Sequence, residues 1–289
     1  MNSPQLQHVQ CLDAQGLHKM AYWQWGDPHH PHVVICVHGL SRQGRDFDVL
    51  AEQLSSHCRV VCPDVVGRGQ SDWLADPAAY AVPTYVADMV TLLARLQART
   101  VDWVGTSMGG LIGLGLSALR NSPVRRLVLN DVGPALNPAA LERIGQYLGV
   151  PRSFADLDDA ADYLWSISQG FGAHTREQWL ALSRHQIRQT SDGRWIQHYD
   201  PSIAQPFRSA SAAQWAQAEQ FLWSAYDSLK QDVLLLRGAE SDLLSELTAK
   251  AMTLRGPRAR LVEFAQVGHA PMLVQPEQRQ AVVDFLLSG

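Results

Sequence analysis

The sequence predicts an α/β protein with a mostly parallel central sheet flanked by helices. Two observations carry this prediction. Short continuous apolar runs, such as HVVICVHG at 32–39, are typical of strands buried on both faces, and segments with helical spacing of apolar residues lie between them. Strands that alternate with helices form βα units and therefore a parallel sheet. The chain has 289 residues, of which 46% are hydrophobic, enough for one large domain with an insertion.

The first half of the chain supplies most of the expected elements. Two opening strands joined by a turn are predicted in HVQCLDAQ (8–15) and MAYWQWG (20–26). Further strands are predicted in HVVICVHG (32–39), RVVCPDV (59–65), VDWVGTS (101–107) and RRLVLND (125–131), with helices at 88–97 and 108–119. The same rhythm returns near the end, with strands in DVLLLRG (232–238) and ARLVEFA (259–265) and helices at 246–254 and 277–287.

The segment from Pro134 to Lys230 interrupts this rhythm. It contains no buried strand run, is helical in texture, and holds five of the nine tryptophans, at positions 165, 179, 195, 215 and 223. We therefore expect one core domain made of residues 1–133 and 231–289, with a helical cap at 134–230 inserted between strands 6 and 7 of the sheet. Its tryptophans suggest either a largely apolar pocket or a cap held together by aromatic packing.

Composition excludes several classes of function. The formal net charge of −4 and the absence of a block of like charges give no general attraction to nucleic acid or to an anionic membrane. The N-terminus lacks the pattern of a secretory signal, and no apolar stretch is long enough to span a bilayer, so we expect a cytoplasmic protein. The four cysteines are expected to be buried and reduced, and no metal site is predicted.

The motif with the clearest chemistry is Gly105-Thr106-Ser107-Met108-Gly109, a G-x-S-x-G at the end of a predicted strand and the start of a predicted helix. A sharp strand–turn–helix connection of this kind exposes a serine as a nucleophile, and the tight turn requires small residues two positions before and after it. Gly105 and Gly109 meet that requirement. The motif therefore predicts Ser107 as the nucleophile.

A serine hydroxyl needs an adjacent base, which a carboxylate in turn orients. His269 is the one histidine between the last predicted strand and the last predicted helix, and we assign it as the base. Two carboxylates fit the order Ser, acid, His. Asp242, in the loop after strand 232–238, is favoured, and Asp131, at the end of strand 125–131, is the alternative, or else a residue that bonds nearby backbone. Glu240 is a weaker candidate.

The oxyanion that forms during acyl transfer needs two preorganised N–H donors. We expect one to be the backbone amide of Met108, directly after the nucleophile, and the other the amide of Leu40, in the loop that opens with His38-Gly39 after the strand at 32–39. His38 is expected to order this loop rather than to act as a second base.

These segments together resemble the α/β-hydrolase superfamily over nearly the whole chain. The resemblance rests on HG at 38–39, GRGQSD at 67–72, GTSMGG at 105–110, the loop with Asp242, and GHAP at 268–271. It implies an α/β-hydrolase fold with a helical cap over the active site and chemistry that needs no metal or organic cofactor. Dehalogenases and epoxide hydrolases of this fold use aspartate at position 107, so a serine there points away from them, and HGLS points away from lipases with an HGGG loop.

The expected function is therefore cleavage of a small, largely apolar carboxylic ester through an acyl-enzyme, as in carboxylesterases. A lactonase or a carbon–carbon bond hydrolase would use the same triad and is the alternative hypothesis. A non-catalytic protein that binds a small molecule is the third hypothesis. The segment LNDVGP at 129–134 resembles a group of bacterial esterase-like hydrolases, which adds hydroxyalkanoate oligomers to the conceivable substrates. The sequence leaves the oligomeric state open.

Overall fold

A computed structural model describes residues 3–288. Its central sheet has eight strands in the order β1-β2-β4-β3-β5-β6-β10-β11. The β1–β2 and β2–β4 pairs are antiparallel, and the other five pairs are parallel. The strands are β1 (Gln5–Asp13), β2 (Gly16–Trp25), β3 (His32–Val37), β4 (Arg59–Pro63), β5 (Thr100–Thr106), β6 (Val124–Asn130), β10 (Asp232–Gly238) and β11 (Arg260–Phe264). The mostly parallel sheet that the sequence predicts is confirmed.

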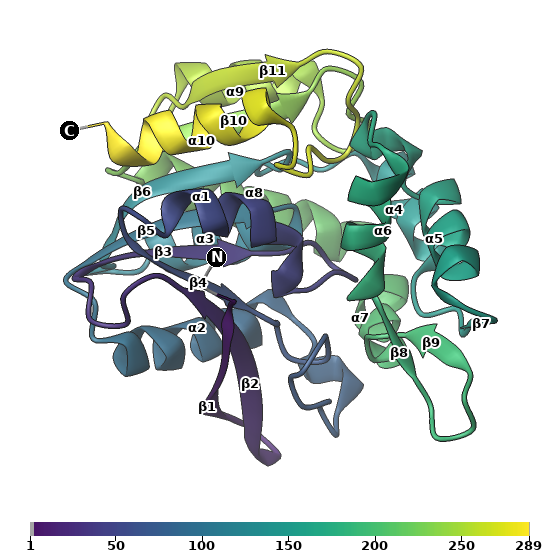
Figure 1. Cartoon of the computed structure of the whole chain (residues 1–289). Helices are drawn as coiled ribbons and strands as arrows, with labels where there is room; N and C mark the ends of the chain where they lie inside the picture. The colour runs from purple at the N-terminus through teal and green to yellow at the C-terminus, as the bar shows by residue number, and fades with distance from the viewer. Residues whose placement is uncertain (1–2, 289) are drawn as a thin grey trace.

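Helices cover both faces of this sheet (Figure 1). Side chains of β3 alternate between the two faces: Val33 and Ile35 pack in one hydrophobic cluster with α2, α3 and α9, while Val34 and Cys36 pack in a second with α1 and α10. The flanking helices are α1 (Asp48–Leu54), α2 (Val82–Leu96), α3 (Met108–Ser117), α9 (Glu246–Leu254) and α10 (Pro276–Leu287). Burial on both faces explains why the parallel strands read as continuous apolar runs.

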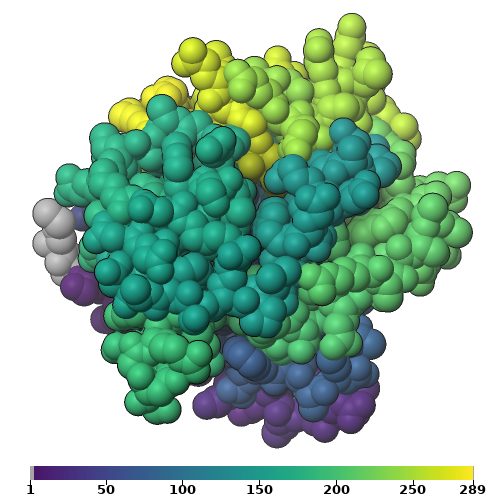
Figure 2. Space-filling view, turned by 90° about the vertical axis from the view of Figure 1, so that its right-hand side faces the viewer, coloured from purple at the N-terminus to yellow at the C-terminus, as the bar shows by residue number. Residues whose placement is uncertain are grey.

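Most of the elements between β6 and β10 lie at one end of the sheet, where Figure 1 shows them in teal and green and Figure 2 shows them covering that side of the molecule. The last helix before β10 instead returns to the sheet, where its Tyr226 packs in the same hydrophobic cluster as α3. The elements between β6 and β10 include the helices α4 (Pro138–Tyr147), α5 (Leu157–Ser166), α6 (Arg176–Arg184), α7 (Ala204–Ser209) and α8 (Ala212–Ser228). The insertion therefore starts after the sixth strand of the central sheet. The division into domains at 133/134 and 230/231 stays a prediction.

The insertion also contains a small three-stranded sheet that the sequence did not reveal. Its strands, β7 (Ser153–Phe154), β8 (Ile187–Gln189) and β9 (Trp195–Gln197), are two or three residues long and pair in the order β7-β9-β8. Strands this short cannot show an alternating pattern, because alternation needs at least four residues to be recognised.

The insertion is fastened to the core through the loop after β4. The amide of Gly69 donates to the His198 carbonyl at 3.0 Å, and the amide of Asp200 donates to the Gly67 carbonyl at 2.7 Å. The hydroxyl of Tyr80 donates to the buried carboxylate of Asp200 at 2.6 Å. These contacts hold the insertion over the ends of the parallel strands, where sites in α/β sheets are usually found.

Candidate active site

Ser107 lies at a sharp turn between β5 and α3. Its backbone has φ 52° and ψ −117°, a left-handed conformation that is unusual for a residue with a side chain. A side chain at Gly105 would collide with the Gly109 carbonyl, and one at Gly109 would collide with the carbonyl of Val37 in the neighbouring strand. The two glycines of the motif are therefore required by the packing of this turn, as the sequence predicts.

The imidazole of His269 lies between Ser107 and a carboxylate. Its Nε2 is 3.0 Å from the Ser107 Oγ, and its Nδ1 is 2.7 Å from the Oδ2 of Asp131. His269 follows β11, and Asp131 follows β6, so three separate strand ends supply the three groups. Because Nδ1–H donates to the carboxylate, Nε2 is left as the acceptor for the serine proton.

The carboxylate of Asp131 is held by two further donors. Gly238 N–H donates to its Oδ1 at 2.9 Å, and the Ser241 hydroxyl donates to its Oδ2 at 2.6 Å. The side chain is fully buried, and its backbone has φ 56°, which aspartate tolerates better than most residues. Burial with three donors fixes the position of the negative charge next to His269.

Asp242, the favoured acid of the sequence analysis, does not contact His269, and that assignment is wrong. Its carboxylate accepts from Arg143 Nε at 2.7 Å and from Nη2 at 3.1 Å, and the two side chains are 45% and 42% exposed. The preceding Ser241 turns inward to Asp131, which leaves Asp242 pointing outward to α4. Asp131 and Asp242 follow two adjacent parallel strands, β6 and β10, so their order in the chain alone could not decide between them.

Two backbone amides near Ser107 are available to a ligand. Neither the Leu40 nor the Met108 N–H donates a hydrogen bond to another group within residues 3–288. The buried Arg68 braces both residues: its Nε donates to the Leu40 carbonyl at 2.8 Å, and its Nη2 lies 3.6 Å from the Met108 sulfur. Unpaired N–H groups at a rigid turn are suited to stabilising an oxyanion.

His38 orders the loop that carries Leu40. Val65 N–H donates to its Nε2 at 3.0 Å, so Nδ1 carries the proton and donates to the Gly39 carbonyl at 2.7 Å. Burial lowers the pKa of this imidazole to about 3, against an ordinary value of 6.5. The ring is therefore neutral in the folded protein at neutral pH, and both of its nitrogens hydrogen-bond to backbone, which fits the structural role expected for it.

The buried His38 should make folding stability fall with acidification. Below pH 6.5 His38 binds a proton in the unfolded chain but stays neutral in the folded protein. Each pH unit of acidification therefore lowers the free energy of unfolding by up to about 1.4 kcal/mol, until the pH reaches the folded pKa. His38→Gln should be less stable at pH 7.5, but its loss of stability between pH 7.5 and pH 5 should be smaller by about 2 kcal/mol. Urea unfolding at the two pH values measures both, and equal losses in both proteins would contradict this account.

A cavity of about 100 Å³ opens beside Ser107 and His269. Apolar side chains from the core and the insertion form much of its wall, among them Leu40, Ile144, Leu164, Phe171 and Met272. This volume is below the roughly 300–1,000 Å³ typical of pockets for drug-sized ligands, which favours a small substrate.

The five tryptophans of the insertion do not line this cavity. Trp165 and Trp179 pack edge to face with ring centroids 5.0 Å apart, and Trp223 packs against Tyr226. Aromatic packing, the second of the two expectations, therefore describes these three, whereas Trp215 packs on Phe207 and also lines a separate apolar groove away from Ser107. Sequence reasoning also missed two arginines of the cavity wall, Arg42 and Arg143; the only signal was that Arg42 follows the HGLS segment.

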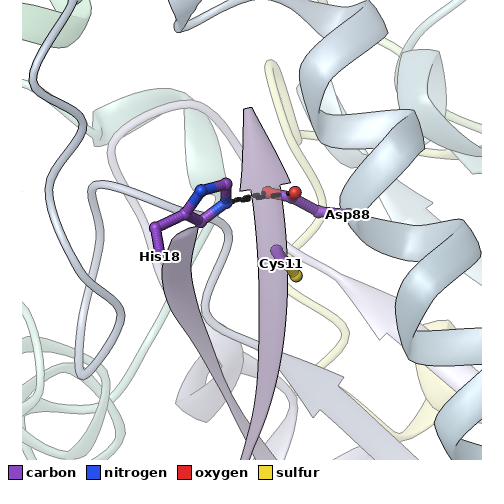
Figure 3. Close-up of side chains that lie close together, drawn as sticks. All are labelled: Cys11, His18 and Asp88. Atoms are coloured by element: carbon purple, nitrogen blue, oxygen red, sulfur yellow. Dashed lines mark hydrogen bonds and ion pairs between the residues drawn. The ribbon is translucent and has the colours of Figure 1, made fainter. Parts of the chain in front are cut away.

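A polar cluster outside the wall of the Ser107 cavity joins the β1–β2 hairpin to α2 (Figure 3). Cys11 and His18 face each other across the hairpin, and the His18 Nε2 lies 3.1 Å from both carboxylate oxygens of Asp88. The three donor atoms lie within 4.8 Å of one another, close enough to consider a metal ion. However, His18 and Asp88 already bond each other directly, and burial raises the pKa of the Cys11 thiol to about 12. We interpret the cluster as a contact that ties the hairpin to the core; the four cysteines are all buried and unpaired.

None of the helices in residues 3–288 has the length and apolar character needed to cross a membrane.

Comparisons with known proteins agree with this fold. A model described as the alpha/beta hydrolase family matches residues 34–285. The chain is 53% identical over 279 residues to the 3-hydroxybutyrate-oligomer hydrolase of Cupriavidus necator, covering 96% of this chain and 95% of that protein. It is 28% identical over 242 residues to the 2-hydroxymuconate semialdehyde hydrolase of a Pseudomonas species, covering 83% and 81% of the two chains.

A solved structure with the same architecture is an alpha/beta hydrolase from Novosphingobium aromaticivorans, 35% identical, with a TM-score of 0.86 and 99% of each chain covered. The sheet order, the serine at the turn after β5 and the match over residues 34–285 lead to one conclusion: this chain belongs to the alpha/beta hydrolase family.

Proposed function

We propose that this protein is a serine hydrolase that cleaves carboxylic esters through an acyl-enzyme, with Ser107 as nucleophile, His269 as base and Asp131 as the acid of the triad. The observation that carries the proposal is the continuous hydrogen-bonded chain from the Ser107 Oγ through both nitrogens of His269 to the buried Asp131 carboxylate. A serine with such a partner is activated for attack on a carbonyl carbon.

In the first half of the reaction the Ser107 Oγ forms a bond to the ester carbonyl carbon, and its proton passes to the His269 Nε2. The carbonyl oxygen becomes an oxyanion, which the Leu40 and Met108 amides stabilise. The tetrahedral intermediate then breaks its bond to the alcohol oxygen, which takes the proton from His269. The acyl group stays on Ser107 and the alcohol leaves.

In the second half, His269 takes a proton from water as the water oxygen attacks the acyl carbon. The second tetrahedral intermediate releases Ser107, which recovers its proton from His269, and the carboxylic acid leaves. Throughout, Asp131 holds the ring in one tautomer and stabilises the imidazolium that forms in each step.

For the substrate we propose short oligomers of 3-hydroxybutyrate or of closely related hydroxy acids. The support is the 53% identity, over nearly the full length of both chains, to a protein named 3-hydroxybutyrate-oligomer hydrolase, together with a small cavity with apolar walls. An ester of a short hydroxy acid presents the compact, weakly polar acyl group that such a cavity accommodates.

The direct test is intact-mass spectrometry after exposure to a fluorophosphonate. One adduct should form on the parent protein and none on Ser107→Ala, because only an activated serine reacts with this probe. A screen of ester, lactone and diketone substrates should then show turnover of the esters. An unlabelled but well-folded parent protein would contradict the proposal and favour a binding role.

A further inference from the structure

Arg42 lies in the wall of the cavity that Ser107 and His269 share. Its side chain is only 11% exposed, so its charge is held inside the protein rather than in solvent. An ideal Cβ placed on Gly39 would lie 3.8 Å from the Arg42 Cγ and also 3.8 Å from the Ser107 Cβ. The side chains of Arg42 and Ser107 therefore both lie next to Gly39.

The guanidinium of Arg42 is fixed by contacts along one edge. Its Nε and Nη2 each donate to the buried Asp46 carboxylate at 2.7 Å, and Gln186 of the insertion donates to the same carboxylate at 3.0 Å. The Phe171 ring lies 5.7 Å from the guanidinium carbon. An arginine held in this way has lost its rotational freedom before any ligand arrives.

The other edge of the guanidinium is free. Within residues 3–288 the Arg42 Nη1 makes no hydrogen bond, and the residue faces the cavity. A planar guanidinium with an open edge matches the two oxygens of a carboxylate, and such charge-assisted pairs are stronger than neutral hydrogen bonds. The edge formed by Nη1 and the second N–H of Nη2 is therefore open to a ligand carboxylate next to the nucleophile, while Asp46, which also lines the cavity, pairs with the first edge.

Resting on the proposed function, we propose that Arg42 binds the free carboxylate at the acid end of an oligomeric hydroxy-acid ester. When the last ester bond of such an oligomer is cleaved, four covalent bonds separate the scissile carbonyl carbon from the carboxylate carbon, a span of about 5 Å at ordinary bond lengths. Arg42 would thus make the protein select acid-ended oligomers and release single hydroxy acids from that end.

Two alternatives can be compared with this proposal: Arg143 as the residue that binds the carboxylate, and a purely structural role for Arg42. Arg143 also lines the cavity, but it is 42% exposed and pairs with the exposed Asp242, so a carboxylate bound there would be screened by solvent. Alternatively, Arg42 could serve only to fasten the insertion through Asp46 and Gln186. A fastening role affects every substrate alike, whereas recognition affects only substrates that carry the carboxylate.

The experiment compares the 3-hydroxybutyrate dimer with its carboxamide, in which a neutral amide of the same size replaces the carboxylate. The parent protein should favour the acid by about 10- to 100-fold in kcat/KM. Arg42→Gln should abolish that preference by lowering kcat/KM for the acid about 10- to 100-fold more than for the amide, mainly by raising KM for the acid; any loss caused by leaving the buried Asp46 carboxylate without its partner is shared by both substrates. Arg42→Lys should keep part of it, and Arg143→Gln should keep all of it.

Several results would overturn the inference. These are equal use of acid and amide by the parent protein, equal losses on both substrates in Arg42→Gln, and loss of the preference in Arg143→Gln instead. If the parent protein cleaved neither dimer and took up no fluorophosphonate, the proposed function itself would fail. Binding is then still measurable by calorimetry on Ser107→Ala, where adding Arg42→Gln should remove the preference for the acid.

Discussion

Ser107→Ala should lower kcat for ester hydrolysis by on the order of 10⁶-fold, because the variant has no oxygen with which to form the acyl-enzyme. The remaining activity would come from the Leu40 and Met108 amides and from substrate binding, which act without the serine. Turnover of p-nitrophenyl butyrate at high enzyme concentration measures the loss. A well-folded Ser107→Ala protein with near-parental turnover would refute the assignment of the nucleophile.

The triad should also behave as one unit. His269→Ala should cost about as much as Ser107→Ala, and the double variant should be no slower than either single variant, within about threefold. Independent contributions would instead multiply. Thermal unfolding of all three variants is the control, since a shared loss of structure would mimic this result.

Asp131→Asn should lower kcat/KM by on the order of 10⁴-fold, whereas Asp242→Asn should stay within about threefold of the parent protein. An asparagine amide at position 131 can donate to the His269 Nδ1, which moves the ring proton to Nε2 and removes the acceptor for the Ser107 proton. Steady-state kinetics with the same ester measures both.

Asp242→Asn is a well-matched control, because it makes the same change of atoms in the neighbouring loop. It breaks an ion pair with Arg143 that is nearly half exposed, and such pairs contribute little. Its loss of activity alone, with Asp131→Asn unaffected, would restore Asp242 as the acid.

The contact between Ser107 and His269 could be predicted from the sequence because a local pattern places each residue. The turn around Ser107 needs glycine on both sides, and His269 is placed by the strand before it and the helix after it. The carboxylate that pairs with His269 could not be chosen in this way. Asp131 and Asp242 follow adjacent parallel strands, and the choice depends on which carboxylate meets the Gly238 amide and the Ser241 hydroxyl, a contact between residues more than 100 positions apart.

Arg42 illustrates a second limit of the sequence. Its orientation is set by Asp46, four positions away, but also by Gln186 and Phe171, which the insertion brings from far along the chain. Likewise, the tryptophans of the insertion could equally line a pocket or pack together until the structure showed the ring of Trp165 against that of Trp179. Contacts between side chains that are far apart in the chain are set by packing, and packing produces no periodic pattern in the sequence.

The position of Asp131 limits how this protein can be re-engineered by exchange of modules. The chain runs from this carboxylate into α4 within seven residues, so a transplanted insertion joined at β6 would replace the carboxylate that pairs with His269 or shift the groups that hold it. A graft should keep 131–133 from the recipient and join nearer Asn137. It should also offer backbone groups equivalent to those of His198 and Asp200, which bond the loop at Gly67 and Gly69. The junction near Asn137 and these two backbone hydrogen bonds therefore decide which insertions are compatible, more than overall sequence similarity does.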